Sequence, residues 1–173
     1  MRVVATAAAS LSAAASKARI LVVEDDVDIL QLTERALIGA GYHVEAAQDG
    51  VAGWEALNAG EFDLMVTDHD MPRLTGLELI TRVRCAHKTL PVILATGALP
   101  TEGLERHSWL QVAATLLKPF SPHQMLESVK AVLLAAQRAI RVADSDNSGV
   151  PKYVILPVRN QVRTDLGIAD GAS

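Results

Sequence analysis

The chain lacks the features that mark several common classes of protein. One cysteine in 173 residues excludes an intramolecular disulfide framework and a zinc site built from cysteines. The formal net charge of −4 provides no electrostatic basis for nucleic-acid binding, so none is expected. No apolar run approaches the roughly 18 residues of a membrane span, so no membrane segment is expected. Half of the residues are nevertheless apolar, which is enough for a buried core without covalent cross-links.

The charge is unevenly distributed along the chain. Residues 1–17 carry a net charge of +2, and residues 140–173 are neutral overall. The middle segment, 18–139, contains 10 basic and 16 acidic residues, a net charge of −6. The negative charge therefore belongs to one segment of ordinary domain length. Within that segment, the acidic residues can be either scattered or clustered at one site.

The two ends of the chain read as accessory segments. Residues 1–17 form an Ala/Ser-rich arm that we expect to be disordered; a signal peptide is the alternative, but the run after Arg2 is only weakly apolar. Residues 140–173 are expected to be a linker and a short tail with no output domain, because a DNA-binding module needs more residues. A run at 144–149 partly resembles a calcium loop, but Ile155 stands where a bidentate Glu is required. Docking, partner binding and disorder all remain open for the tail.

Short apolar runs alternate with segments of helical spacing in the middle of the chain. Unbroken apolar runs of this length are typical of strands buried on both faces, as in a parallel sheet. The predicted strands are 20–23, 64–67, 92–95 and 115–117, with 43–46 as a weaker fifth. Five strand–helix units with right-handed crossovers predict an α/β fold with a doubly wound open parallel sheet.

The helical segments between the strands differ in the strength of their patterns. The first is expected to pack through Ile29, Thr33, Ala36 and Ala40, and the third through Leu79, Ile80 and Val83. The last begins with a capping box at Ser121–Gln124 and continues with Leu126, Val129, Leu133, Ala136 and Ile140. The segment 101–110 has the least helical periodicity.

Polar and charged residues follow four of the predicted strands. In an open parallel sheet, the crevice at the carboxyl ends of the strands is where ligands bind. The strands place the following residues at that edge: Glu24, Asp25 and Asp26 after the first, Asp68, His69 and Asp70 after the third, Thr96 after the fourth, and Lys118 after the fifth. A large part of the negative charge of the middle segment is therefore concentrated at one edge of the predicted sheet.

These residue types suit phosphoryl transfer. Glu24, Asp25 and Asp68 would repel one another unless a divalent cation joined them, and oxygen ligands suit Mg²⁺. Lys118 can hold an anionic oxygen, and the Thr96 hydroxyl can donate a hydrogen bond to the same oxygen. The arrangement predicts transfer of a phosphoryl group to Asp68.

Four motifs in the right order and spacing resemble the receiver domain of two-component response regulators, in particular stand-alone chemotaxis regulators. They are ILVVEDD at 20–26, DLMVTDHDMP at 63–72, LPVILATG at 90–97 and LLKPF at 116–120. The resemblance covers 18–139, the expected domain. It implies a flavodoxin-like sheet with strand order 2-1-3-4-5 and helices on both faces.

The resemblance also implies a role for each matching residue. Asp68 is expected to be the phospho-acceptor. Asp25 is expected to bind Mg²⁺ directly, Glu24 to bind it through a metal-bound water, and the Asp70 backbone carbonyl to be the third protein ligand. Thr96 is expected to be the switch hydroxyl and Lys118 to contact the phosphoryl group, with a cis peptide at Lys118–Pro119. Thr115 stands where many receivers have Tyr or Phe, so signal output is expected to differ. The Asp70 side chain is expected to affect the lifetime of the aspartyl phosphate.

The implied protein is a cytoplasmic phosphoprotein that signals and is not an enzyme, beyond assisting its own phosphorylation and dephosphorylation. The expected phosphodonor is a sensor histidine kinase or a histidine phosphotransfer protein, and the downstream target is a protein that the sequence does not identify. Two alternatives are weighed. Asp68 and Asp70 superficially match the aspartyl pair of haloacid-dehalogenase phosphatases, which however follows the first strand. A receiver-fold adaptor that is never phosphorylated is the second. His69 is expected to be an exposed loop residue, with a metal ligand as the alternative.

Overall fold

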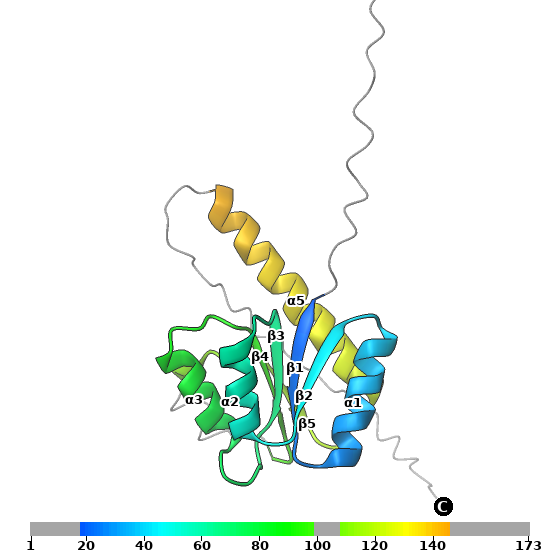
Figure 1. Cartoon of the computed structure of the whole chain (residues 1–173). Helices are drawn as coiled ribbons and strands as arrows, with labels where there is room; N and C mark the ends of the chain where they lie inside the picture. The colour runs from blue at the N-terminus through cyan, green and yellow to red at the C-terminus, as the bar shows by residue number, and fades with distance from the viewer. Residues whose placement is uncertain (1–17, 99–107, 146–173) are drawn as a thin grey trace, which may run out of the picture.

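A computed structural model describes residues 18–98 and 108–145 of the chain. The expectations for the arm, for the tail after residue 145 and for most of the 101–110 segment lie outside these residues. Within them, five strands form one sheet (Figure 1): β1 Arg19–Val23, β2 His43–Ala47, β3 Leu64–Asp68, β4 Val92–Thr96 and β5 Ala114–Leu117.

The sheet has the predicted topology. Its strands are ordered β2-β1-β3-β4-β5, and every neighbouring pair is parallel. All five predicted runs are strands, including the weak one at 43–46. Every residue of β3 and β4 is buried, and this explains why their sequences show a continuous apolar run rather than an alternating pattern.

Helices cover both faces of the sheet (Figure 1). They are α1 Val27–Gly39, α2 Gly50–Ala59, α3 Gly76–Cys85 and α5 Pro122–Ser145, with a 3₁₀ turn η1 at Ser108–Leu110. One core lies between the sheet and α1 with α5, and a second lies between the sheet and α2 with α3. The predicted contact positions of the third helical segment, Leu79, Ile80 and Val83, are all fully buried in the second core.

The packing face of α1 differs from the predicted one. The helix buries Leu30, Thr33 and Leu37, whereas Ala36 is only half-buried and Ala40 lies exposed at the helix end. The two faces are adjacent on the helix and share Thr33. The face with Leu30 and Leu37 buries more apolar area than the face with Ala36 and Ala40, so the leucine face packs against the sheet.

The start of α5 has the predicted capping box. The Ser121 backbone N–H donates to Gln124 Oε1 at 2.7 Å, and the Gln124 N–H donates to Ser121 Oγ at 3.2 Å. Val129 and Leu133 are buried as predicted, and the structure adds Met125 to the same face. None of the described helices combines the length and hydropathy needed to cross a bilayer.

Strand register brings the expected site residues to one edge. Asp68 on β3 is aligned with Ala95 on β4, and Thr96 on β4 is aligned with Leu117 on β5. Each strand end is therefore displaced by no more than about one residue from its neighbour. As a result, the side chains that follow β1, β3, β4 and β5 emerge at the same level of the sheet.

Candidate metal and phosphoryl site

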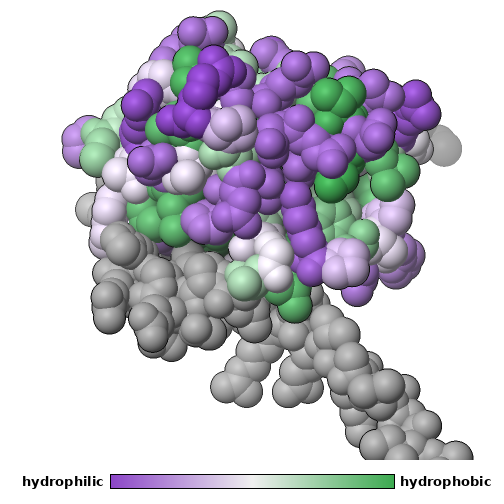
Figure 2. Space-filling model, turned by 90° about the horizontal axis from the view of Figure 1, so that it is seen from below, coloured by the Kyte–Doolittle hydropathy of each residue, from purple (hydrophilic) through white to green (hydrophobic). Residues whose placement is uncertain are grey.

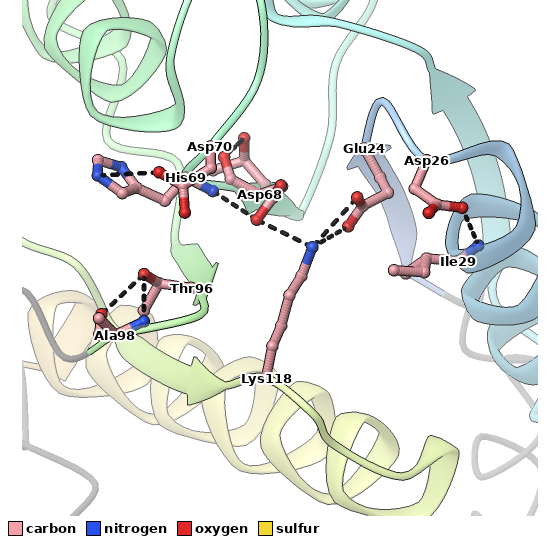
Figure 3. A network of polar contacts seen from close by, with 10 residues as sticks. Glu24, Asp26, Ile29, Asp68, His69, Asp70, Thr96, Ala98 and Lys118 are labelled. Atoms are coloured by element: carbon pink, nitrogen blue, oxygen red, sulfur yellow. Dashed lines mark hydrogen bonds and ion pairs between the residues drawn. The ribbon is translucent and has the colours of Figure 1, made fainter.

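Hydrophilic residues gather where the strands end. Figure 2 views the molecule from the side of the carboxyl ends of the strands, and most of the residues on this surface are hydrophilic. Figure 3 shows the polar side chains at this edge, with Asp68 and Glu24 facing each other across the Lys118 ammonium. The first question is how each side chain is held there.

Three carboxylates form a compact group at this edge. Oxygen atoms of Glu24, Asp25 and Asp68 all lie within 4.8 Å of one another. Glu24 and Asp68 are each only 5% exposed, while Asp25 is exposed. The Glu24 backbone N–H donates to the Ala47 carbonyl at 3.0 Å, which continues the β1–β2 ladder by one residue and fixes Glu24 at the sheet edge. The backbone of the sheet therefore holds buried acidic groups close together.

Lys118 joins two of these carboxylates. Its Nζ lies 2.8 Å from Glu24 Oε2 and 3.0 Å from Asp68 Oδ1 (Figure 3). Its own backbone N–H donates to the Thr96 carbonyl at 2.8 Å, so the residue follows the β4–β5 ladder directly. The Lys118–Pro119 peptide is cis, as the resemblance predicts.

Burial and pairing change the acidity of these groups in defined directions. Burial raises the pKa of Glu24, and the nearby Asp68 charge raises it further, although the hydrogen bond from Lys118 offsets part of the effect. Burial by itself would lower the pKa of Lys118, but hydrogen bonds to Glu24 and Asp68 outweigh it, so the pKa of Lys118 is raised. The group of three carboxylates thus contains one ammonium, which pairs with two of them, so the site keeps a net negative charge.

The donor set fits a hard divalent cation. Three carboxylates within reach of one point, with no nitrogen or sulfur ligand in the group, match the oxygen coordination of Mg²⁺. Among the described residues, this is the one cluster of at least three acidic, histidine or cysteine side chains that could hold a metal ion. His69 is not part of this group, and its Nε2 lies 3.8 Å from Asp70 Oδ1. The Asp70 side chain is 74% exposed. The resemblance assigns the backbone carbonyl of Asp70, and not this side chain, to the metal.

Thr96 lies at the expected edge, but its hydroxyl is turned elsewhere. The side chain is 1% exposed, and its Oγ1 donates to the Ala98 carbonyl at 2.8 Å (Figure 3). The Ala98 N–H in turn approaches the same oxygen at 3.4 Å. The structure therefore brings Glu24, Asp25, Asp68 and Lys118 together, whereas the Thr96 hydroxyl is satisfied within its own turn.

Asp26, the third acidic residue after β1, has a local structural role. Its carboxylate accepts hydrogen bonds from the Asp28 N–H at 2.9 Å and the Ile29 N–H at 3.2 Å, and so it caps α1 (Figure 3). Adjacent acidic residues thus divide between the metal cluster and the helix start. A run of three acidic letters does not by itself reveal this division.

Gly76 matters more than its sequence position suggests. A Cβ at this position would lie 2.1 Å from the Asp68 carbonyl oxygen, far inside any real contact. The Gly76 N–H also donates to the His69 carbonyl at 3.0 Å. The start of α3 therefore packs directly on the backbone of the proposed phospho-acceptor, a contact that no local sequence pattern predicts.

Comparisons with known proteins agree with this geometry. The family model described as "Response regulator receiver domain" matches residues 20–130. Among curated proteins, the chain is 30% identical over 131 residues to "Probable transcriptional regulatory protein SilR" of Salmonella typhimurium, covering 73% of this chain and 58% of that protein. It is 37% identical over 117 residues to "Response regulator MprA" of Mycobacterium sp. (strain KMS), covering 66% and 50%. The chain thus matches about half the length of these relatives.

Solved structures of response regulators share this fold. The chemotaxis response regulator CheY4 of Vibrio cholerae is similar with a TM-score of 0.62 and 30% identity, covering 67% of this chain and 98% of that one. A CheY-like receiver domain protein from Methanospirillum hungatei JF-1 is similar with a TM-score of 0.67 and 29% identity, covering 71% and 98%.

Proposed function

The chain belongs to the response regulator receiver domain family, and on that premise we propose that it is a phosphoacceptor signalling switch. In this proposal Asp68 receives a phosphoryl group from the phosphohistidine of a partner protein. One observation carries it: the partly buried Lys118 pairs with Asp68 and Glu24 beside a third carboxylate, Asp25, at the carboxyl edge of the sheet.

The residues of this edge divide the chemistry among them. An Asp68 carboxylate oxygen attacks phosphorus, a P–O bond forms, and the P–N bond to the donor imidazole breaks as the imidazole leaves. Glu24, Asp25, Asp68 and the Asp70 carbonyl would hold Mg²⁺. When bound, Mg²⁺ would supply positive charge to the phosphoryl oxygens. Lys118 would exchange one of its carboxylate partners for a phosphoryl oxygen.

Thr96 supplies the conformational part of the proposal. A phosphoryl group on Asp68 offers the Thr96 hydroxyl a charged acceptor, stronger than the neutral Ala98 carbonyl that it contacts at 2.8 Å. Exchange of that hydrogen bond would favour a second arrangement of the turn after β4. Thr115, partly buried in β5, offers no aromatic ring to move with it.

The proposed partners follow from the same chemistry. A sensor histidine kinase or a histidine phosphotransfer protein would supply the phosphoryl group, and a downstream protein would read the phosphorylated state by direct contact. The curated relatives include a protein named as a probable transcriptional regulator. For this chain we propose signalling by protein–protein contact in the cytoplasm.

Labelling with a small phosphodonor tests the assignment of Asp68. The full chain incubated with acetyl phosphate and Mg²⁺ is expected to gain one phosphoryl group by intact mass, and Asp68→Asn is expected to gain none. Asp63→Asn is the matched control, because Asp63 is exposed and accepts a hydrogen bond from the Arg19 N–H at the opposite edge. Equal labelling of Asp68→Asn and the wild type would refute the assignment. Steady multiple turnover of phosphate esters would indicate a phosphatase instead.

A further inference from the structure

Asp49 links two loops at the carboxyl edge of the sheet. It follows β2 and is 7% exposed. Its Oδ1 accepts hydrogen bonds from the Val51 N–H at 2.8 Å and the Ala52 N–H at 3.0 Å, and so it caps α2. Its other oxygen, Oδ2, forms an ion pair with the Arg73 guanidinium from the loop between β3 and α3. One buried carboxylate therefore serves both the helix start and a neighbouring loop.

Arg73 belongs to the same loop as Asp70, whose backbone carbonyl is assigned to the metal. It leads from Asp68 through Asp70 to the start of α3, and Figure 3 shows its first residues beside Asp68. Leu74, one residue after Arg73, is 4% exposed and lies against α2, where a Cβ on Gly50 would come within 2.5 Å of the Leu74 carbonyl oxygen. The loop is therefore packed on the first turn of α2, the same turn that Asp49 caps.

Arg73 occupies a backbone conformation that does not favour its residue type. Its φ of 68° lies in the left-handed region, where glycine or asparagine is the ordinary choice. The side chain is 64% exposed, so burial of apolar area does not compensate for this conformation. Two interactions offset the cost of this conformation: the ion pair of the Arg73 side chain with the buried Asp49, and the hydrogen bond from the Leu74 N–H to the Pro72 carbonyl at 2.8 Å.

We propose that Arg73 is a positioning residue for the metal site: its ion pair with Asp49 fixes the 69–74 loop so that the Asp70 carbonyl faces the carboxylate cluster. This inference rests on the proposed function, which assigns that carbonyl to Mg²⁺. Groups that hold metal ligands in place commonly contribute about 10-fold or more to metal affinity. Arg73→Ala is therefore expected to weaken Mg²⁺ binding about 10-fold.

The sign of this effect separates positioning from simple electrostatics. Removing a positive charge near an acidic site would strengthen cation binding if only Coulomb attraction mattered. Positioning predicts the opposite, weaker binding in Arg73→Ala. Arg73→Lys keeps the charge and a donor for Asp49 Oδ2, so it is expected to recover most of the affinity. Asp49→Asn keeps the amide oxygen that caps α2 but loses the ion pair, so it is also expected to bind Mg²⁺ more weakly.

Calorimetric titration of the full chain with Mg²⁺ provides the measurement, and phosphorylation kinetics provide the second readout. In Arg73→Ala, the Mg²⁺ concentration for half-maximal labelling by acetyl phosphate should rise about 10-fold, while the rate at saturating Mg²⁺ stays near that of the wild type. Glu45→Gln is the matched control, because it breaks the exposed Arg19–Glu45 ion pair at the opposite edge. This control is expected to leave both values unchanged.

The outcomes distinguish this inference from the proposed function. If the wild type binds Mg²⁺, Asp25→Asn loses binding and Arg73→Ala binds as the wild type does, the positioning role is wrong and the proposed metal site stands. Tighter binding by Arg73→Ala would show a purely electrostatic effect and would also overturn the inference. If the wild type binds no Mg²⁺, the proposed metal site and the role of Arg73 are both wrong.

Discussion

Two partly buried cations lie near opposite ends of the sheet and meet different partners. Lys118, at the carboxyl end, pairs with the Glu24 and Asp68 carboxylates at 2.8 and 3.0 Å. Arg84, near the end of α3, donates to four backbone carbonyls in the loops that precede β4 and β5. These carbonyls, at 2.8 to 3.2 Å, belong to Lys88, Leu90, Leu110 and Gln111.

The difference appears in the acidity of the two groups. Burial lowers the pKa of Arg84, because its partners are neutral carbonyls and no carboxylate compensates for the lost hydration. The pKa of Lys118 is raised, because its two charged partners outweigh burial. A cation that faces carboxylates takes part in a charge balance that Mg²⁺ or a phosphoryl group can alter. A cation that faces carbonyls connects loops, and no ligand replaces it.

Removing Lys118 is expected to have the largest effect on stability. Lys118→Ala leaves Glu24 and Asp68 buried without a counter-charge, so the free energy of unfolding without Mg²⁺ should fall by about 3 kcal/mol. Because a bound cation substitutes for the ammonium, added Mg²⁺ should recover part of this loss. Urea unfolding with and without Mg²⁺ provides the measurement.

The control for this experiment is an exposed lysine in a similar pair. Lys130 lies 3.3 Å from Glu127 on α5, and both side chains are 58% exposed. Lys130→Ala should change stability by less than about 1 kcal/mol, with or without Mg²⁺. An equal loss for Lys118→Ala in both conditions would contradict a role in charge balance.

Removing Arg84 is expected to destabilise the protein in a way that no cation repairs. Arg84→Met leaves carbonyls, three of them in partly buried hydrogen bonds, without this donor, so the free energy of unfolding should fall by about 2 kcal/mol. Addition of Mg²⁺ should leave the difference from the wild type unchanged, because the metal site lies at the other edge. Arg82→Met, at an exposed position of the same helix, should change stability by about 0.5 kcal/mol at most. If Mg²⁺ restored the stability of Arg84→Met, the proposed difference between Lys118 and Arg84 would be wrong.

The smallest expected effect on stability concerns the capping boxes at the starts of α3 and α5, which lie at the carboxyl end of the sheet. Hydrogen bonds from the Thr75 backbone N–H and hydroxyl lower the pKa of Glu78 at the start of α3. A carboxylate with a lowered pKa adds stability above its unfolded pKa and loses it as the pH falls through the folded value. Glu78→Gln should therefore be less stable than the wild type near neutral pH and equal to it in acid.

The equivalent position of the second box provides the reverse experiment. Gln124 closes the box at the start of α5 and does not titrate. Gln124→Glu should add a small stability increment near neutral pH that disappears in acid, measured by urea unfolding across pH. A pH-independent difference for both variants would show that the carboxylate charge contributes nothing to these helix starts.

The predictable part of the molecule rests on periodicity and chain order. Four apolar runs, a weaker fifth and the helical segments between them were sufficient to predict the parallel sheet, because short apolar runs that alternate with helices are typical of its strands. Chain order then placed Asp68, Lys118 and Glu24 at one edge, since parallel strands all end on the same side. For the same reason, much of the net charge of −6 on residues 18–139 lies at this edge.

Other features required long-range geometry. The face of α1 follows from which side chains bury more area against α5 and the sheet, so a choice of alanines over Leu30 and Leu37 was wrong. Asp26 and Asp49 cap helices, yet nothing local distinguishes them from the ligand candidate Asp25. The pairing of Asp49 with Arg73 joins residues 24 positions apart, and no period or motif connects them.

By itself, the sequence determined which chemical groups stand at the end of each strand, because burial patterns are local and the direction of parallel strands is uniform. Only the tertiary structure decided how those groups are paired: Lys118 between Glu24 and Asp68, the Thr96 hydroxyl on Ala98, and Gly76 against the Asp68 backbone. Pairing depends on distances of a few ångströms between separate elements. Those distances are set by the packing of the two cores, to which residues from the whole domain contribute.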